Sequence, residues 1–282
     1  MQQSDPRVHL VDLDRDHPGF RDDSYRHRRN EIAALALLHQ SGAPAPFVDY
    51  TAEEHQVWAE VWRHLEPLHV DLACRPWREA SARLGLSRTR IPQFQELNAV
   101  LQPAFGFRLS PVAGLVTPRV FLEQLAQDCF LATQYMRHCS RPLYTPEPDV
   151  IHELVGHGPG LLDEAIVGLS RAFGQAVAGA SAARELALIR VYWWTLEFGV
   201  VIERGKHKAY GAGLLSSFGE LGRFSEHAEL RPFDLAEMAA TAFDPTDYQT
   251  QLFVARSYDH VVADLHTWLN QAVTAPESTP LA

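Results

Sequence analysis

Hydrophobic and polar residues follow each other along this chain mostly with the period of an α-helix. Apolar positions recurring every three to four residues predict helices over 22–40, 51–73, 76–85, 92–102, 118–135, 149–156, 161–178, 182–203, 234–242 and 257–270. Thr51 followed by Glu54 matches a capping box, and Pro67 is expected to kink or divide the helix that follows it. The pattern therefore predicts a mainly α fold.

Strand-like patterns are confined to four short runs. These runs cover residues 106–109, 115–117, 206–210 and 251–255. Neither an internal repeat nor an interdomain linker interrupts residues 16–271. We therefore expect a single catalytic domain with a minor β component, preceded by a flexible N-terminus (1–15) and followed by a disordered tail (272–282).

Composition and charge narrow the classes of partner. The 282 residues are 46% hydrophobic and 21% charged, and the net charge of −10 disfavours nucleic acid and anionic membranes as partners. No apolar run reaches the ~18 residues of a membrane span, and the N-terminus does not resemble a signal peptide. The three cysteines form no CxxC pattern, which is typical of reduced thiols. We expect a cytoplasmic protein.

Candidate chemistry begins with two histidines five residues apart, His152 and His157, in PEPDVIHELVGHGPG. Among fourteen histidines, roughly one such pair is expected by chance. His64 and His69 form another pair at this separation, but they lie in a helical apolar pattern that favours structural histidines. The spacing alone therefore indicates little.

The surroundings of His152 and His157 are more informative. Residues five apart on a regular α-helix point about 140° apart, so a shared metal requires a deformed helix. Gly156 and Gly158 can end or deform the helix so that the second imidazole turns back toward the first. The zinc-protease motif HExxH needs a spacing of four, which makes a zinc hydrolase the less favoured alternative.

A third ligand is predicted at Glu197. Helical spacing places it within an apolar stripe formed by Leu186, Ile189, Trp193, Leu196 and Val200. A buried carboxylate is costly unless it is paired, protonated or bound to metal, and an ion pair with Arg190 is the alternative. Two histidines and one carboxylate form the facial triad of non-haem Fe(II) enzymes that activate oxygen. The residues thus predict a mononuclear iron oxygenase, with its substrate and electron source open.

Longer motifs point to a family. The runs DHPGFRDDSYRHRR, IPQFQELNAVL, GFRLSPVAGLV, TQYMRHCSRPLYTPEPDVIHELVGHGP, YWWTLEFG and KAYGAGLLSSFGEL resemble, in this order, the catalytic domain of the pterin-dependent aromatic amino acid hydroxylases. The resemblance covers about residues 16–260 and is closest to the phenylalanine-hydroxylating branch. It implies a basket of helices with a minor β component.

The resemblance also implies an activity. Members of this family use Fe(II), dioxygen and a tetrahydropterin, such as tetrahydrobiopterin, to hydroxylate the ring of a free aromatic L-amino acid. Conversion of phenylalanine to tyrosine is the expected reaction. Meta-hydroxylation of phenylalanine, or tyrosine or tryptophan as substrate, are alternatives, and a catalytically inactive ligand-binding relative is a further one.

Site residues follow from the resemblance position by position. The iron ligands correspond to His152, His157 and Glu197. The arginine that holds the substrate carboxylate corresponds to Arg137, for which a salt bridge to Asp149 or Glu147 is the alternative. The substrate pocket corresponds to Thr145, Pro146, Trp193, Phe198 and Ser216. The pterin site corresponds to Gly114, Leu115, Val116, Phe121, Glu153 and Tyr192.

Several positions depart from the vertebrate members. Leu131 stands where they carry a histidine near the pterin, and Gly158 and Gly160 replace bulkier residues. In AFDPTDYQ, Pro245 occupies the position where tyrosine hydroxylases carry an aspartate, with Asp244 beside it. The resemblance includes no regulatory domain and no C-terminal heptad helix, so we expect a monomer or weak dimer that is not activated through such a domain.

Overall fold

The computed structural model describes residues 13–40 and 42–274, and it is mainly helical. The longer helices are α1 (Asp23–Leu38), α2 (Ala52–Leu72), α3 (Arg75–Leu84), α4 (Phe94–Phe105), α5 (Pro118–Leu125), α6 (Glu164–Val177), α7 (Ala182–Tyr192) and α12 (Tyr258–Thr274). Short helices are α8 (Ala212–Ser216), α9 (Phe218–Leu221), α10 (Phe224–His227), α11 (Leu235–Ala240) and the 3-10 turn η3 (Gly160–Leu162). Two π-helical segments complete the set, η2 (His152–His157) and η4 (Trp193–Glu197).

Two small sheets accompany the helices. Strands β1 (Arg108–Val112) and β2 (Cys129–Thr133) pair in parallel, with Arg108 opposite Cys129. The second sheet has the order β4-β3-β6-β5, from strands β3 (Val200–Glu203), β4 (Lys206–Ala209), β5 (Glu229–Pro232) and β6 (Gln251–Ala255). The minor β component is therefore split between two places in the fold.

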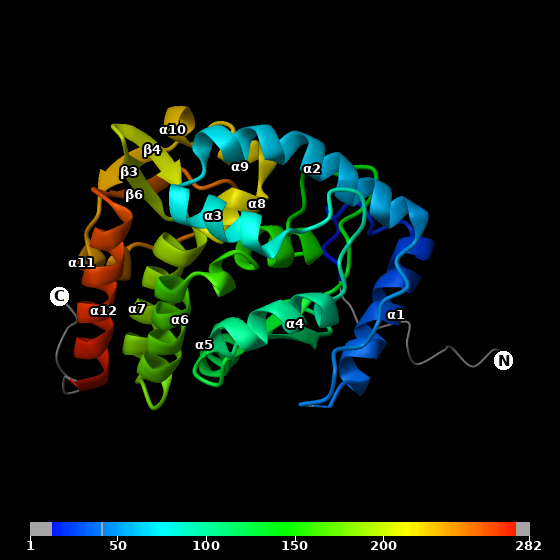
Figure 1. Cartoon of the computed structure of the whole chain (residues 1–282), viewed down its shortest axis with the longest axis horizontal. Helices are drawn as coiled ribbons and strands as arrows, with labels where there is room; N and C mark the ends of the chain where they lie inside the picture. The colour runs from blue at the N-terminus through cyan, green and yellow to red at the C-terminus, as the bar shows by residue number, and fades with distance from the viewer. Residues whose placement is uncertain (1–12, 41, 275–282) are drawn as a thin grey trace.

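The helices form a basket around the centre of the chain. In Figure 1, α6, α7 and α12 stand side by side at one end, α1 lies at the other end, and α2 runs across the top. Packing of α6 against both α5 and α12 joins the lower helices. The buried apolar side chains form one hydrophobic cluster, which includes the fully buried Trp58, Phe94 and Phe173. The prediction of a mainly α basket with minor β structure is confirmed.

Local signals explain most helix boundaries. The capping box at Thr51 is present, because its hydroxyl accepts from the Glu54 N–H and the Glu54 carboxylate accepts from the Thr51 N–H. Pro67 lies inside α2 without dividing it, so that part of the prediction was wrong. Packing of the buried face of α2, including Trp62 and Leu65, outweighs the local cost of the proline.

Two predicted helices end too late, and one predicted strand is absent. The helix predicted over 118–135 stops at Leu125, and Asp128 with φ 54° reverses the chain into β2, whose buried apolar run imitates a helical pattern. The helix predicted over 182–203 becomes π-helical at Trp193 and ends before β3. The strand predicted over 115–117 is a loop, and the neighbouring strand is β1.

Other elements gave no usable sequence pattern. Helices α8, α9 and α10 have four or five residues each, too few for a helical period to repeat, and β5 is a short strand that went unpredicted. The predicted tail begins too early, since α12 continues through 272–274. Residues 1–12 and 275–282, which hold most of the two predicted mobile ends, lie outside the described residues.

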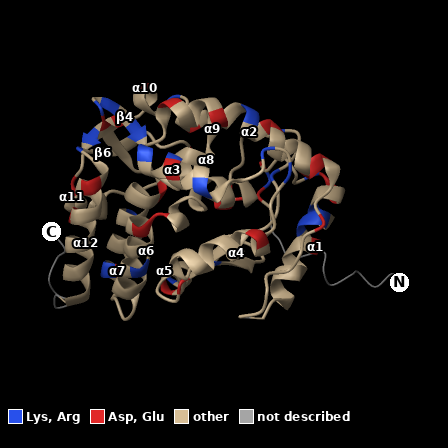
Figure 2. Cartoon of the chain, in the orientation of Figure 1, with Lys and Arg blue, Asp and Glu red and all other residues tan. Residues whose placement is uncertain are grey.

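The surface and the cysteines are consistent with the composition. Figure 2 shows basic and acidic residues interspersed along the outer elements. Within the described part of the chain, no helix is both long and apolar enough to cross a membrane. Cys74 and Cys129 are buried, Cys139 is exposed, and all three are free thiols.

The second histidine pair is structural. His69 is 5% exposed and its Nε2 lies 2.6 Å from the carbonyl oxygen of Leu215, whereas His64 contacts Glu60 on the helix surface. Neither belongs to the metal-ligand cluster found among the described residues. Burial lowers the pKa of His69 to about 4.

This shift predicts a specific acid destabilisation. Between pH 6.5 and 4 the unfolded chain protonates at His69 while the folded chain does not, so stability falls as the pH is lowered. The His69 contribution lost from pH 7 to pH 5 is about 2 kcal/mol. We expect H69Q to lose correspondingly less unfolding free energy over this range than the parent protein. Urea unfolding of both metal-free proteins at the two pH values measures it, and equal losses would contradict the assignment.

Candidate active site

Two histidines and one carboxylate converge at the centre of the fold. The Nε2 atoms of His152 and His157 lie 3.0 Å apart, and the carboxylate of Glu197 lies 3.7 and 3.1 Å from them, respectively. One ligand atom from each residue falls within 4.8 Å of the others, and no other such cluster occurs among residues 13–40 and 42–274. Two imidazoles and a carboxylate suit a divalent transition metal and leave coordination positions open.

The spacing of five is explained by a π-helix. The η2 segment spans His152–His157, and Gly158 N–H donates to the carbonyl of Glu153, five residues back, at 3.0 Å. This wider turn brings residues five apart to the same side, which an α-helix cannot do. The sequence predicted a deformed helix here, and the structure shows that the whole segment between the histidines is deformed.

The third ligand lies at the end of the second π-helix. Phe198 N–H donates to the Trp193 carbonyl at 2.9 Å, and Glu197 is the last residue of η4. The apolar stripe predicted on a regular helix is therefore not continuous, and Leu186 is 46% exposed. Arg190 donates to the carbonyls of Ala239 and Ala240 instead of pairing with Glu197. The ion-pair alternative for Glu197 is thus wrong.

Close backbone contacts fix this arrangement. A Cβ at Gly156 would lie 2.6 Å from the carbonyl oxygen of Ala212, so η2 packs directly on α8. A Cβ at Gly158 would lie 2.4 Å from the Leu154 carbonyl oxygen, whereas at Gly160 it would meet only the Ile166 side chain, at 3.2 Å. Of the two glycines that depart from the vertebrate members, only Gly158 is required by the local backbone.

Burial and mutual contact set the charges of the metal ligands. Burial, followed by the proximity of His157, lowers the pKa of His152 to about 4. Burial also disfavours a charged His157, but the carboxylate of Glu197 outweighs it and raises the pKa of that histidine. The same contact lowers the pKa of Glu197 against the effect of burial. A metal ion would replace the proton that His157 shares with Glu197.

One cavity of about 180 Å³ contains every predicted substrate-pocket residue. Arg137, Thr145, Pro146, Trp193, Phe198 and Ser216 line it together with His152 and Glu197. The hydroxyl of Ser216 lies 3.1 Å from Nδ1 of His152, so it orients this imidazole from the side opposite the metal position. These residues come from four separate segments of the chain, and the fold brings them together.

Arg137 is both ion-paired and part of the cavity wall. Its Nε and Nη2 donate to the two carboxylate oxygens of Asp149 at 2.9 and 2.8 Å. Both side chains are almost fully buried, and Arg137 outweighs burial to lower the pKa of Asp149. The predicted salt-bridge alternative therefore exists, and it holds the guanidinium rigidly at the cavity rather than removing it.

Trp193 and Phe198 line another side of the cavity, and Phe243 and Gln249 support the Trp193 indole from outside it. Trp193 stacks on Phe243 with centroids 4.2 Å apart, and its indole donates to Oε1 of Gln249 at 3.1 Å. The Gln249 amide donates to the carbonyls of Asp244 and Asp247, both at 2.8 Å. Gln249 therefore connects the aromatic wall to the loop 244–249.

The residues predicted for the pterin are divided between a loop with an exposed leucine and a more buried group of side chains. Gly114, Leu115 and Val116 form the loop between β1 and α5, with Leu115 71% exposed. Phe121 and Tyr192 meet edge to face at 5.7 Å. Glu153 is buried and accepts from the backbone N–H and the hydroxyl of Thr133, each at 3.0 Å. Burial raises the pKa of Glu153 to about 7.

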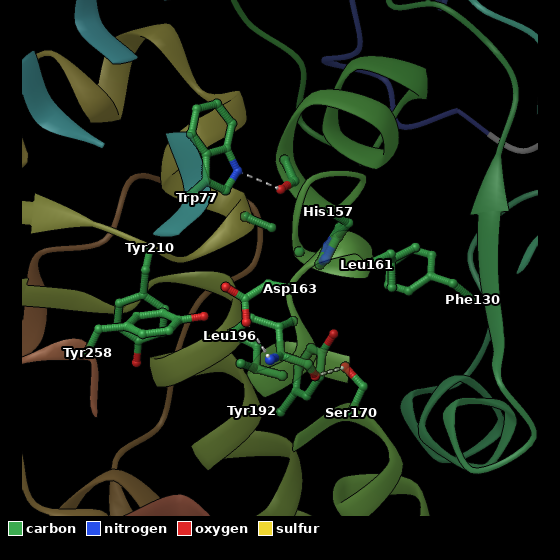
Figure 3. A pocket seen from close by; sticks show the side chains of 14 residues that line it. Trp77, Phe130, His157, Leu161, Asp163, Ser170, Tyr192, Leu196, Tyr210 and Tyr258 are labelled. Atoms are coloured by element: carbon green, nitrogen blue, oxygen red, sulfur yellow. Dashed lines mark hydrogen bonds between the residues drawn. The ribbon is translucent and has the colours of Figure 1, made fainter. Parts of the chain in front are cut away.

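A second, smaller cavity of about 30 Å³ lies beside His157, away from the other two ligands. Figure 3 shows His157, Phe130 and Tyr192 on its walls, facing Tyr210 and Tyr258. The indole of Trp77 donates to the Gly156 carbonyl at 3.3 Å and closes this side of η2. Tyr192 therefore lines this small cavity beside His157 and does not line the main cavity.

Sequence reasoning missed one residue that lines the main cavity and two that hold its lining residues in place. Asp149 was considered only as an alternative partner of Arg137, and Gln249 was not considered at all. Glu220, in the motif SSFGEL, lines the cavity and is 9% exposed. A four-residue helix is too short for its sequence pattern to show which side chains are buried. Only the position of Glu220 within the motif SSFGEL could have indicated its role.

The fold and this site define a mainly helical protein with a two-histidine, one-carboxylate metal centre. A family model described as "Biopterin-dependent aromatic amino acid hydroxylase" matches residues 7–276. The chain belongs to this family.

Curated relatives carry two names. A tyrosine 3-monooxygenase of Drosophila melanogaster is 43% identical over 264 residues, covering 92% of this chain and 46% of the relative. A chloroplastic phenylalanine 4-monooxygenase of Physcomitrium patens is 43% identical over 275 residues, covering 95% and 69%. The chain thus spans about half the length of several of its curated relatives.

Solved structures of the family share the fold. Phenylalanine hydroxylase of Chromobacterium violaceum with bound iron(III) and oxidised 7,8-dihydrobiopterin has a TM-score of 0.76 at 30% identity, covering 88% of this chain and 93% of that one. The phenylalanine hydroxylase of Legionella pneumophila has a TM-score of 0.74 at 29% identity, covering 80% and 91%.

Gly156 provides a test of the site geometry. We expect G156A to weaken metal binding at least about tenfold and to destabilise the protein by about 1–3 kcal/mol, because the methyl group forces η2 away from α8. G168A is the matched control. Gly168 lies in α6, and a Cβ there would meet only the His266 side chain, at 3.5 Å. Chelator competition and thermal unfolding measure both effects. Normal metal affinity in G156A would contradict the proposed packing constraint.

Proposed function

We propose that this protein is an Fe(II)- and tetrahydropterin-dependent monooxygenase that hydroxylates the ring of free L-phenylalanine, using dioxygen, to give tyrosine. The observation that carries the proposal is the single cavity that joins Arg137, an aromatic wall and two of the three metal ligands. A carboxylate-binding group and a ring-binding surface beside a metal centre suit an aromatic amino acid.

The donor set fits iron. Two neutral imidazoles and one carboxylate, all buried or nearly so, match the ligand preference of non-haem Fe(II), and no thiolate lies among them to favour a closed zinc site. His152, His157 and Glu197 would hold the metal, which together with the reduced pterin supplies oxygen activation. The chain itself orients the ring and keeps the site dry.

The remaining residues position the substrates. Arg137, fixed by Asp149, would bind the substrate carboxylate, while Trp193, Phe198 and Pro146 enclose the ring. Thr145 donates to the Glu147 carbonyl at 3.0 Å and shapes the turn that carries Pro146. Ser216 supports His152 from behind.

The pterin would lie against the loop Gly114–Val116, stacked on Phe121. Phe121 packs against Phe130, which in turn contacts the His157 ring at 4.6 Å, so this surface leads toward the metal ligands. Glu153, which accepts from Thr133, and Tyr192, which meets Phe121 edge to face and lines the smaller cavity beside His157, would then contact the pterin directly or through water.

Phenylalanine is favoured over tyrosine by the loop 244–249. Pro245 lines the cavity, whereas the Asp244 carboxylate is exposed and accepts from the N–H and hydroxyl of Thr246 at 2.8 and 2.6 Å. The position that carries aspartate in tyrosine hydroxylases is therefore apolar in this chain. An apolar contact suits a ring without a hydroxyl.

We further propose that the chain from residue 16 to the end of α12 at Thr274 acts as one catalytic domain, as a monomer or weak dimer in the cytoplasm. Free cysteines and the absence of a membrane-spanning helix from the described residues are compatible with this setting. Its partners would then be small molecules: the amino acid, dioxygen and the reduced pterin.

Reconstitution tests the proposal. The metal-free protein is loaded with Fe(II), supplied with tetrahydrobiopterin and oxygen, and offered phenylalanine, tyrosine and tryptophan separately. We expect para-tyrosine from phenylalanine, identified by chromatography against para- and meta-tyrosine standards, and loss of both iron and product in H157A. No hydroxylated product from any amino acid would overturn the proposal, and stoichiometric zinc with peptidase activity would favour a hydrolase.

Pro245 supplies a test of substrate choice. We expect P245D to raise the ratio of tyrosine to phenylalanine hydroxylation about tenfold. The new carboxylate can accept a hydrogen bond from the hydroxyl of tyrosine, whereas beside phenylalanine it is desolvated without a partner. D244N is the matched control and should keep the parental ratio, since Asp244 is exposed and does not line the cavity. Competition assays with both amino acids measure the ratio, and an unchanged ratio in P245D would argue against this role.

A further inference from the structure

Four carboxylates line the candidate substrate cavity: Glu147, Glu197, Glu220 and Asp247. Glu147 is neutralised by Arg29 at 2.6 Å, with His17 also within 3.4 Å. Glu197 faces the two histidines of the metal site. Asp247 is exposed to solvent and accepts a backbone N–H from its neighbour. Only the charge of Glu220 is both buried and unmatched by a cation of the described chain.

Glu220 is held firmly in place without being neutralised. It lies in α9, is 9% exposed, and its Oε1 accepts the backbone N–H of Gln249 at 2.9 Å. No Lys, Arg or His of the described residues forms an ion pair with it. Arg223 places its guanidinium over the Tyr248 ring at 4.4 Å, and its charge favours an ionised Glu220 less than burial disfavours it. Burial accordingly raises the pKa of Glu220 to about 7.

A buried carboxylate without a cationic partner destabilises the folded chain. Such a group is expected where a ligand supplies the missing charge. Because Glu220 borders the same cavity as Arg137, the cavity presents one fixed cation and one fixed carboxyl group, which a bound cation would keep ionised. A free α-amino acid carries the complementary pair of charges on adjacent groups.

We infer that Glu220 binds the α-ammonium group of the amino acid substrate, while Arg137 binds its carboxylate. The inference rests on the proposed function and adds a second charge contact to it. It also restricts the substrate class to free amino acids with an unmodified amino group. N-acylated amino acids and peptide C-termini retain the carboxylate but lose the ammonium charge, so they would leave Glu220 buried and unpaired.

The test compares two ligands that differ only in the ammonium group. L-phenylalanine and 3-phenylpropanoate are titrated into the Fe(II)-loaded protein without oxygen, and their dissociation constants are measured by calorimetry. We expect phenylalanine to bind the parent protein at least about tenfold more tightly. E220Q should lose this preference, through weaker binding of phenylalanine and unchanged binding of 3-phenylpropanoate.

Two further variants sharpen the result. E220D keeps the charge and should keep most of the preference for phenylalanine. E226Q makes the same chemical change at an exposed position of the next helix, α10, and should bind both ligands as the parent protein does. If E220Q fails to fold, the ligand pair on the parent protein and E220D still decide the question.

The outcomes separate this inference from the proposed function. Full preference for phenylalanine in E220Q, or no preference in the parent protein, would overturn the role of Glu220 even if phenylalanine is hydroxylated normally. Tight, Glu220-dependent binding of phenylalanine without any hydroxylation would instead refute the proposed reaction and support the ammonium site.

Discussion

The i→i+5 hydrogen bond is the constraint on which this site depends. It is seen between Gly158 and Glu153 and between Phe198 and Trp193, at the ends of the two π-helical segments of the described residues, and it widens each helix where a candidate metal ligand faces inward. A regular α-helix would direct His152 and His157 to different sides. The direct packing of Gly156 on Ala212 holds the first of these segments in register with α8 and hence with Ser216.

Ion pairs then fix the loop between β2 and η2, residues 134–151. Arg137 and Asp149 pair across the turn, and Val150 N–H donates to the Tyr135 carbonyl at 2.8 Å. Arg29 reaches the same turn from α1 and pairs with Glu147. Each pair is costly to desolvate; the Arg137–Asp149 pair offsets this cost with two parallel hydrogen bonds, whereas the buried Nε of Arg29 has no hydrogen-bond partner. The result is a rigid wall on which a ligand can bind with little reorganisation.

The sequence allowed prediction of what depends on local chemistry and long motifs. The sequence predicted the capping box of α2, the cluster of His152, His157 and Glu197, and six of the residues that line the main cavity. The errors arose where tertiary contacts decide the local structure. Buried β2 resembled a helix, the chain after Tyr192 could not be distinguished from regular helix, and Glu220 resembled a surface charge. Periodicity reports which residues are buried, and it does not distinguish a buried strand from a helix or an α-turn from a π-turn.

Gln249 has a consequence for how this protein can change over evolutionary time. Its side chain accepts a hydrogen bond from the indole of Trp193 and donates to two carbonyls of the 244–249 loop. Its backbone N–H donates to the carboxylate of Glu220. Three parts of the cavity wall therefore share one residue. Substitutions that move the loop also move the aromatic wall, so a shift in ring preference is expected to require linked changes rather than a single replacement. Divergence of substrate choice on this scaffold should therefore leave Gln249 in place while its surroundings vary together.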